Sequence, residues 1–211
     1  MKHLFLVRHA KSSWADETLS DRERPLSARG VSQLAPLGNA LKSVGAFEGE
    51  VYSSNARRAV ATLQCILPDT VAAERCHTLS ALYTFDYRRL LAWLEEQADA
   101  PQITLVGHNP ALLELAQSLL KQPPEQLPTA SVIHIRLSIK HWRQIGRGKG
   151  KLVTLITPQD YSYAHCERKL KKRARTAGDD PARDIPKALH HQLDRLRPVS
   201  YTHLTLPTIL R

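Results

Sequence analysis

An arginine and a histidine, Arg8 and His9, directly follow the short apolar run Leu4–Val7 near the start of the chain. Ligands of open α/β sheets bind where strands end, so a strand over this run would deliver both side chains to a binding edge. A guanidinium can hold a phosphate by paired hydrogen bonds while a neighbouring imidazole attacks the phosphorus atom. The pair therefore indicates phosphoryl transfer, although the dipeptide is common on its own.

A second arginine comes from the segment Ser54–Thr62. If this segment is helical, Ser54, Arg58 and Thr62 share one face, because side chains four residues apart lie on the same side of a helix. Arg57 then points roughly 100° away. We therefore predict Arg58 as a phosphate ligand and Ser54 as a substrate-binding residue, with Arg57 at the surface. The alternative is that both arginines solvate an exposed helix start.

A second histidine, His108, follows the apolar run Ile103–Val106 and repeats the opening arrangement. Gly107 permits a close backbone approach, and Asn109 and Pro110 are predicted to be the N-cap and the first residue of a helix. Free amides at such a helix start favour an anion, so Asn109 is a candidate substrate-binding residue. The predicted catalytic group has four members: Arg8, His9, Arg58 and His108.

Alternating strand and helix patterns must position these side chains. Apolar runs predict strands at Leu4–Val7, Val51–Tyr52, Ile103–Val106, Ser131–Ile139 and Lys151–Thr157, the last two suited to a hairpin. Helical spacing predicts a helix from Val31 to Gly45, preceded by a Ser27 N-cap and kinked at Pro36. Further helices are predicted at 56–67, from Asp86 onward and after Pro110. This alternation predicts a three-layer α/β/α fold with a mostly parallel central sheet.

Composition narrows the class of protein. The 211 residues suffice for one α/β domain plus an extension, and no apolar run approaches the ~18 residues of a membrane span. The 3 cysteines lack metal-ligand spacing and disfavour a disulfide framework, so we expect a cytoplasmic location. The 10 histidines show no His-x-x-x-His pattern, and no metal or other cofactor is predicted.

Positive charge is concentrated toward the C-terminus. Residues 165–211 contain 11 Lys and Arg against 5 Asp and Glu, which supplies +6 of the chain's formal charge of +10. The basic run Arg168–Arg175 is typical of a solvated segment, and it also suits a nucleic acid or another acidic partner. We expect a catalytic domain at 1–160 and a basic, partly helical or disordered extension at 161–200. Residues 201–211 resemble translated adapter sequence and are treated as non-native.

Four ordered motifs make the sequence resemble the histidine phosphatase superfamily, which has the phosphoglycerate mutase-like fold. They are Leu6–Ser12, Asp21–Ser27 followed by Gly30, Ser54–Thr62 and Val106–Pro110. The resemblance covers about residues 1–158 and is strongest to the small SixA-type phosphohistidine phosphatases. It implies His9 as nucleophile and no metal. It also implies that Arg8, Arg58 and His108 form the phosphate pocket, with Lys11 and Ser12 as substrate-binding neighbours.

Many larger members of this superfamily add a carboxylic acid that protonates the leaving group. The candidates in this sequence are Asp21 and Asp86, but Asp86 resembles an N-cap and Asp21 a loop-organising side chain. A missing acid fits phosphohistidine as substrate, because an imidazole leaves more easily than an alkoxide. The expected protein is thus a monomeric, metal-independent phosphatase acting on a phosphorylated protein, such as a histidine phosphotransfer domain. Two alternatives remain: a small-molecule phosphomonoesterase, and a binding or scaffold protein that uses its basic tail.

Overall fold

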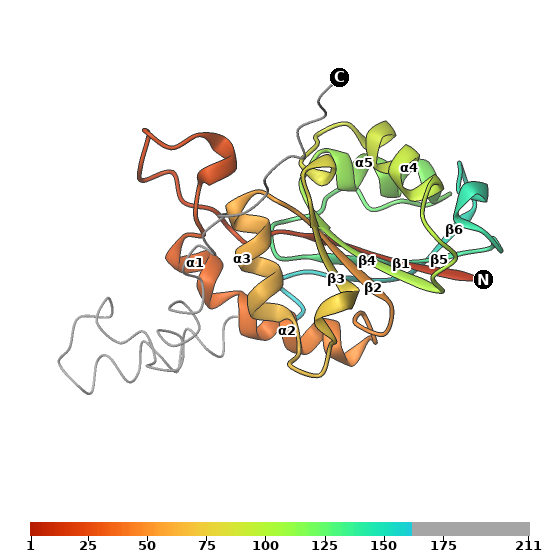
Figure 1. Cartoon of the computed structure of the whole chain (residues 1–211), viewed down its shortest axis with the longest axis horizontal. Coiled ribbons are helices and arrows are strands. Elements are labelled where there is room, and N and C mark those ends of the chain that lie inside the picture. The colour runs from red at the N-terminus through yellow and green to blue at the C-terminus, as the bar shows by residue number, and fades with distance from the viewer. Residues whose placement is uncertain (162–211) are drawn as a thin grey trace, which may run out of the picture. The chain divides into compact units, whose positions relative to one another are not determined.

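The computed structural model describes residues 1–161, so the predicted tail at 201–211 and nearly all of the extension at 161–200 lie outside it. A central sheet has the strand order β3-β2-β4-β1-β5-β6 (Figure 1). Its strands are β1 (Lys2–Arg8), β2 (Glu50–Ser54), β3 (Cys76–Leu79), β4 (Gln102–Gly107), β5 (Val132–Leu137) and β6 (Gly150–Ile156). The α-helices are α1 (Ala28–Ser32), α2 (Leu34–Ser43), α3 (Arg57–Ile66), α4 (Tyr87–Glu95) and α5 (Ala111–Leu119).

The sheet is mostly parallel, as predicted. Strand β4 pairs in parallel with β1 and β2, and β2 pairs in parallel with β3. Strand β5 runs antiparallel to β1, and β6 forms the predicted hairpin with β5. Strand β3 was not predicted, because this four-residue edge strand is too short and too polar to show an apolar run.

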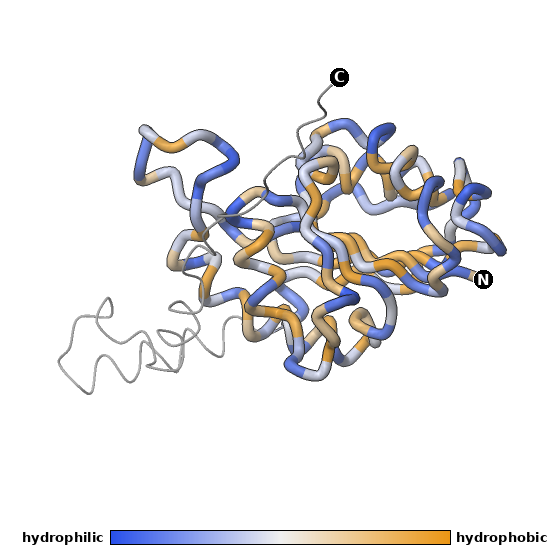
Figure 2. Tube along the Cα trace, viewed as in Figure 1, coloured by the Kyte–Doolittle hydropathy of each residue, from blue (hydrophilic) through white to orange (hydrophobic). Residues whose placement is uncertain are grey.

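Both faces of the sheet are covered by helices, which gives the predicted three-layer α/β/α fold. Alternate residues of a strand point to opposite faces, so Leu4 and Leu6 of β1 join the core under α4 and α5. Phe5 and Val7 join the core under α2 and α3. Figure 2 shows the strands of the sheet as largely hydrophobic, between helices in which hydrophobic and hydrophilic residues alternate.

The predicted helix from Val31 to Gly45 is two helices, α1 and α2. Ser27 caps α1 as predicted, since its hydroxyl accepts a hydrogen bond from the Gly30 amide at 3.1 Å. The break between α1 and α2 falls at Gln33, three residues before Pro36, where a kink was predicted. Pro36 is the third residue of α2. In this first turn its missing N–H removes no intrahelical hydrogen bond, so the proline is compatible with α2.

The helix after β4 begins one residue later than predicted. Pro110 is the N-cap of α5 and the helix starts at Ala111, so the prediction of Asn109 as N-cap was wrong. The Asn109 side chain instead donates from Nδ2 to the Leu127 carbonyl at 3.0 Å. At α4 the predicted start is confirmed, because Asp86 accepts a hydrogen bond from the Arg88 amide at 2.9 Å.

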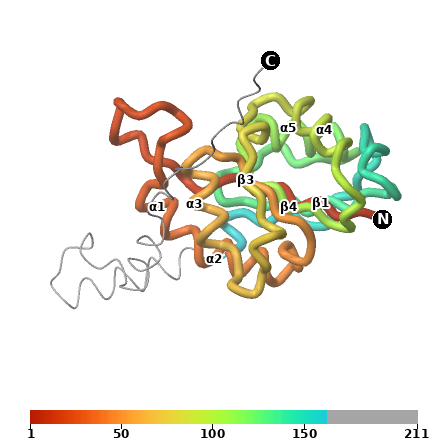
Figure 3. The backbone as a smooth tube through the Cα atoms, in the orientation of Figure 1, coloured from red at the N-terminus to blue at the C-terminus, as the bar shows by residue number. Residues whose placement is uncertain are grey.

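A long polar loop joins β1 to α1 and contains the 3-10 turn Asp21–Glu23. Figure 3 shows it extending from the sheet on the side where α1 lies. After the loop, the backbone at Gly30 packs closely against the backbone at Lys11. A Cβ on Gly30 would stand 2.1 Å from the Lys11 carbonyl oxygen. Only glycine permits this close approach. Across residues 1–161, no helix is long and apolar enough to cross a membrane.

Candidate active site

Parallel pairing brings the carboxyl ends of three strands together. Arg8, the last residue of β1, pairs with Gly107, the last residue of β4, and the His9 amide donates to the Gly107 carbonyl at 3.2 Å. Strand β2 lies on the other side of β4 and ends at Ser54. The residues that follow these strand ends therefore meet at one edge of the sheet, as the sequence pattern predicts.

His9 has a defined tautomer. Its Nδ1 lies 2.7 Å from the Ala10 carbonyl oxygen, which can only accept, so Nδ1 carries the proton. Its Nε2 accepts a hydrogen bond from Arg58 Nε at 3.2 Å. Burial lowers the pKa of His9 to about 4; the Ala10 hydrogen bond opposes this shift, and the charges of Arg58 and Arg8 reinforce it. The imidazole is therefore neutral near pH 7, with the lone pair of a nucleophile on Nε2.

Arg58 is buried on α3 whereas Arg57 is exposed, which confirms the predicted orientation of this adjacent pair. Thr62 fixes the start of the helix: its hydroxyl donates to the Arg58 carbonyl at 2.7 Å and accepts from the Ala10 amide at 3.0 Å. Ser54 was predicted to share this helical face, but it lies at the end of β2. It still reaches the site from there.

His108 joins Ser54 and Arg58 across the site. Since the Arg58 guanidinium has no acceptor, His108 Nδ1, at 3.4 Å from Arg58 Nη2, carries the lone pair. Nε2 then donates to the Ser54 hydroxyl at 2.8 Å. Burial lowers the pKa of His108 to about 3, with smaller effects from His9 and Arg58. The two imidazole rings lie 5.0 Å apart, both neutral near pH 7.

Arg8 presents a buried donor that lacks a partner. Its Nη1 donates to the Leu127 carbonyl at 2.8 Å, and the same carbonyl accepts from Asn109. Its Nε has no hydrogen-bond partner in the part of the chain that the structure describes, although that atom is buried. A buried unpaired donor costs about 1–3 kcal/mol, so an anion that accepts from it would be stabilised.

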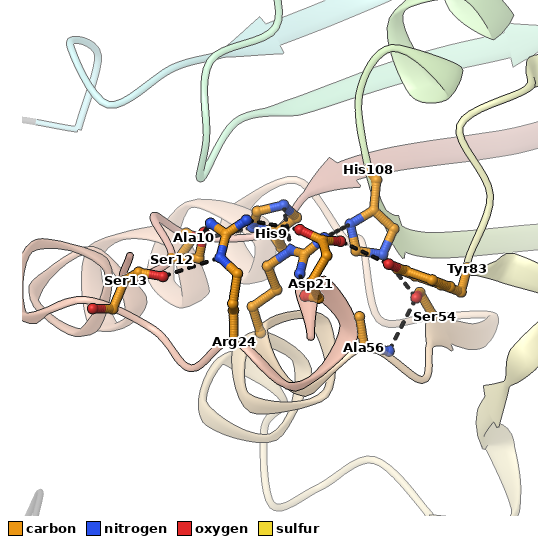
Figure 4. A network of polar contacts seen from close by, with 11 residues as sticks. His9, Ala10, Ser12, Ser13, Asp21, Arg24, Ser54, Ala56, Tyr83 and His108 are labelled. Carbon is orange, nitrogen blue, oxygen red and sulfur yellow. Dashed lines mark hydrogen bonds and ion pairs between the residues drawn. The ribbon is translucent and has the colours of Figure 1, made fainter. Parts of the chain in front are cut away.

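Asp21 contacts the site from the long loop. Its Oδ2 accepts hydrogen bonds from Arg58 Nη2 at 2.8 Å and from the Tyr83 hydroxyl at 2.7 Å, and its Oδ1 pairs with Arg24 Nη1 at 2.7 Å (Figure 4). Its backbone carbonyl also accepts from Arg58 Nη1. Partial burial would raise the pKa of Asp21, but the bonds from Tyr83 and Arg58 outweigh it and lower that pKa to about 2.

A family model matches the first part of the chain. Residues 4–87 match the model of the histidine phosphatase superfamily (branch 1). The chain is similar to this superfamily over these residues.

The wider similarities cover about three quarters of the chain. An uncharacterised chloroplastic protein of Arabidopsis thaliana is 28% identical in an alignment of 171 residues that covers 74% of this chain and 78% of that protein. SixA from Nakamurella multipartitia has a TM-score of 0.63 at 22% identity, covering 74% of this chain and 96% of that one. The protein histidine phosphatase SixA complexed with tungstate has a TM-score of 0.59 at 22% identity, covering 75% and 98%.

The fold is therefore the phosphoglycerate mutase-like fold of the SixA type, as the motifs suggested. The superfamily match and these solved structures support phosphatase activity for the chain. Within this superfamily fold, the site combines a neutral imidazole nucleophile with two guanidinium groups. It can accept a phosphoryl group and neutralise its charge.

The two candidates for a general acid, Asp21 and Asp86, lie in different places. Asp86 is the N-cap of α4, and its side chain accepts a hydrogen bond from the Arg88 amide. Asp21 lies in the site, but a carboxylate with a pKa of about 2 carries no proton to donate near pH 7. Its hydrogen bonds make it a group that holds Arg58 and Arg24.

The two substrate-binding candidates after His9 differ in their exposure. The Lys11 side chain is exposed. Ser12 is buried, and its hydroxyl accepts from Arg24 Nη2. Both residues help to shape the loop, since the Lys11 carbonyl accepts from the Ser27 amide at 2.8 Å.

Arg24 and Tyr83 were not predicted as residues of the site. Arg24 was detectable, because it stands three residues after Asp21 within a motif already singled out. Its side chain is 6% exposed, and its guanidinium stacks 3.2 Å from the centroid of the Trp14 ring. Tyr83 is 62 residues from Asp21 in the chain, and no local spacing connects them.

Proposed function

We propose that this protein removes phosphate from phosphohistidine in signalling proteins, through a phosphohistidine intermediate on His9. One observation supports this substrate above others. The carboxylate that reaches the nucleophile's surroundings, Asp21, is ionised between Arg58 and Arg24, so it offers no proton to a leaving group. Such a site favours substrates whose leaving group needs no added proton from the enzyme.

In the first step, the lone pair of His9 Nε2 attacks phosphorus and the bond from phosphorus to the leaving nitrogen breaks. A phosphoimidazole protonated on its other ring nitrogen leaves as neutral imidazole, so the step needs no enzyme acid. Arg58 must release its hydrogen bond to Nε2 and turn its donors to the phosphoryl oxygens. Arg8 Nε, unpaired within residues 1–161, supplies a further donor for the same charge.

In the second step, water attacks the phosphorus on His9, and the bond to Nε2 breaks. Nε2 regains its lone pair and the water proton leaves with inorganic phosphate or to solvent. His108 contributes a ring nitrogen whose lone pair accepts a hydrogen bond from Arg58. When phosphate replaces that contact, a proton taken up on His108 Nδ1 adds a third donor for the phosphoryl oxygens.

The donor set supports a metal-independent form of this reaction. Two guanidinium groups counter the phosphate charge directly. Among residues 1–161, no three His, Cys, Asp or Glu side chains are grouped as a metal site would require. In this proposal residues 1–160 form the catalytic domain, which acts as a cytoplasmic monomer on a phosphorylated protein partner. The basic run Arg168–Arg175 lies outside the described residues.

The deciding experiment uses a histidine phosphotransfer domain phosphorylated on histidine. The full-length wild type is expected to release phosphate and His9→Ala to release none. His77→Ala removes an imidazole that pairs with Glu50 on the β2–β3 edge, so it serves as a matched control and should match the wild type. Absence of release by the wild type, or equal release by His9→Ala, rejects the proposal. Faster release from sugar or nucleotide phosphates than from phosphohistidine identifies a small-molecule phosphomonoesterase instead.

A further inference from the structure

An exposed phenylalanine lies beside the phosphate pocket. Phe85 is 45% exposed, and its ring centroid is 5.6 Å from that of His108. Across residues 1–161 exposed large apolar side chains are few: Met1, Trp14, Phe85 and Val153. Of these, Phe85 is in ring contact with a residue of the pocket, so its exposed face adjoins the place where a substrate would emerge.

A tyrosine extends this aromatic surface. The Tyr83 ring stands edge-on to His108, with centroids 5.4 Å apart at 87°, and lies 5.6 Å from the Phe85 ring at 72°. Its hydroxyl is held by Asp21 at 2.7 Å, which fixes the direction of the ring. His9 is the next ring in this series, 5.0 Å from His108. One wall of the pocket is therefore aromatic from the rim to the nucleophile.

The backbone around Phe85 is held on both sides. The Thr84 hydroxyl, on a buried residue, accepts from the Asp86 amide at 3.1 Å. Asp86 in turn accepts from the Arg88 amide at the start of α4. The turn is thus locked by side-chain hydrogen bonds, and the ring is presented to solvent by a fixed backbone. Asp86, considered above as an acid, supports the position of Phe85.

We propose that Phe85, together with Tyr83, forms a leaving-group subsite that binds a planar aromatic ring attached to the phosphoryl group. The inference rests on the proposed function for its physiological ring, an imidazole, and it applies equally to a phenyl ring. A ring leaving the pocket past His108 meets the exposed Phe85 face, and offset or edge-on ring contact adds to simple burial. The missing enzyme acid and the aromatic wall thus select the same substrates, those with planar leaving groups of low basicity.

Phosphonates test this subsite without any chemical step. Phenylphosphonate and methylphosphonate share the charged head and differ in the ring, so the ratio of their dissociation constants measures the ring contact. The wild type should bind phenylphosphonate about fivefold more tightly than methylphosphonate. Phe85→Ala should bring the ratio close to one while leaving methylphosphonate binding within about twofold, since the charged groups are unchanged.

Two further variants keep the test decisive. Phe85→Leu retains apolar area without a ring, and should keep less than half of the wild-type preference if ring contact is the cause. Val153→Ala removes an exposed apolar side chain from β6 and should keep the full preference. A wild type without preference for the phenyl compound, or an unchanged ratio in Phe85→Ala and Phe85→Leu, overturns the subsite.

Kinetics separate this inference from the proposed function. Acetyl phosphate has a leaving group of low basicity without a ring, and p-nitrophenyl phosphate has one with a ring. Phe85→Ala should raise KM about fivefold for p-nitrophenyl phosphate and leave KM for acetyl phosphate unchanged. If the wild type ignores the phosphorylated protein but shows this difference, the subsite stands and the phosphohistidine substrate does not. If it hydrolyses the phosphorylated protein and shows no difference, the subsite alone is rejected.

Discussion

Arg58 Nε lies 3.2 Å from His9 Nε2 and donates a hydrogen bond to it. The guanidinium that is placed to hold a phosphoryl oxygen thus also binds the lone pair of the nucleophile. This contact keeps His9 neutral and orients its ring, and it must break when phosphate arrives. Arg58 therefore has two roles, one before substrate binding and one after it.

Replacing Arg58 tests both roles. Arg58→Ala should lower kcat/KM by about 10²–10³, the usual cost of removing a donor that stabilises transition-state charge. Arg58→Lys keeps the charge but loses the forked donors, so it should recover only part of the activity. Arg57→Ala is the matched control, because that neighbouring side chain is exposed, and its kcat/KM should stay within about twofold of the wild type. Equal losses at both positions would contradict the assignment.

The Arg58 orientation was predictable from the sequence because it depends on local geometry. Once a helix follows β2, its periodicity decides which of two adjacent arginines faces the sheet. Strand ends also determine where Arg8, His9 and His108 meet, because parallel strands share one carboxyl edge. These four positions needed only the periods of helices and strands and the order of the elements.

Asp21 provides a second prediction, because a positioning carboxylate and a general acid respond differently to substitution. Asp21→Asn keeps the shape but removes the charge that pairs with Arg58 and Arg24. We expect kcat to fall by about tenfold, by the same factor for p-nitrophenyl phosphate and for phenyl phosphate. Loss of a general acid would instead cost more with phenyl phosphate, whose leaving group is more basic. Steady-state kinetics with the two esters distinguish the two roles.

The partners of Asp21 mark the limit of prediction from sequence. Tyr83 and Arg58 come from segments 62 and 37 residues away, and only tertiary packing brings them to one carboxylate. The prediction of Asn109 as an N-cap failed for a related reason. Its side chain donates a hydrogen bond to the Leu127 carbonyl instead of capping the helix. Tertiary contacts of this kind leave no spacing to detect.

Chelation tests the charge balance of the pocket. Because Arg8 and Arg58 counter the phosphate charge, we expect EDTA to leave the rate of phosphate release unchanged, and added Mg²⁺ to change it by less than about twofold. The measurement is kcat/KM for p-nitrophenyl phosphate before and after dialysis against the chelator. A loss that returns on adding back a divalent cation would show that a metal takes part.

A histidine pair away from the active site, of which His134 is buried, makes stability depend on pH. His134 is 8% exposed; its Nε2 lies 2.9 Å from His3 Nδ1, and its ring stacks on Phe5 with centroids 4.0 Å apart. Burial lowers the pKa of His134 to about 4, with further effects from His3 and Arg136. Since the unfolded chain protonates this group at higher pH than the folded chain does, acid favours unfolding.

The sign and the window follow from that pKa. Stability from neutral His134 is fully present above its unfolded pKa of 6.5, falls as the pH drops below it, and levels off below about 4. His134→Gln keeps a side chain that can bond to His3 but does not titrate. Urea unfolding at about pH 7 and about pH 4.5 should show the wild type losing on the order of 1–3 kcal/mol more than His134→Gln across this interval. Equal losses in the two proteins would mean that His134 titrates in the folded state as it does in the unfolded chain.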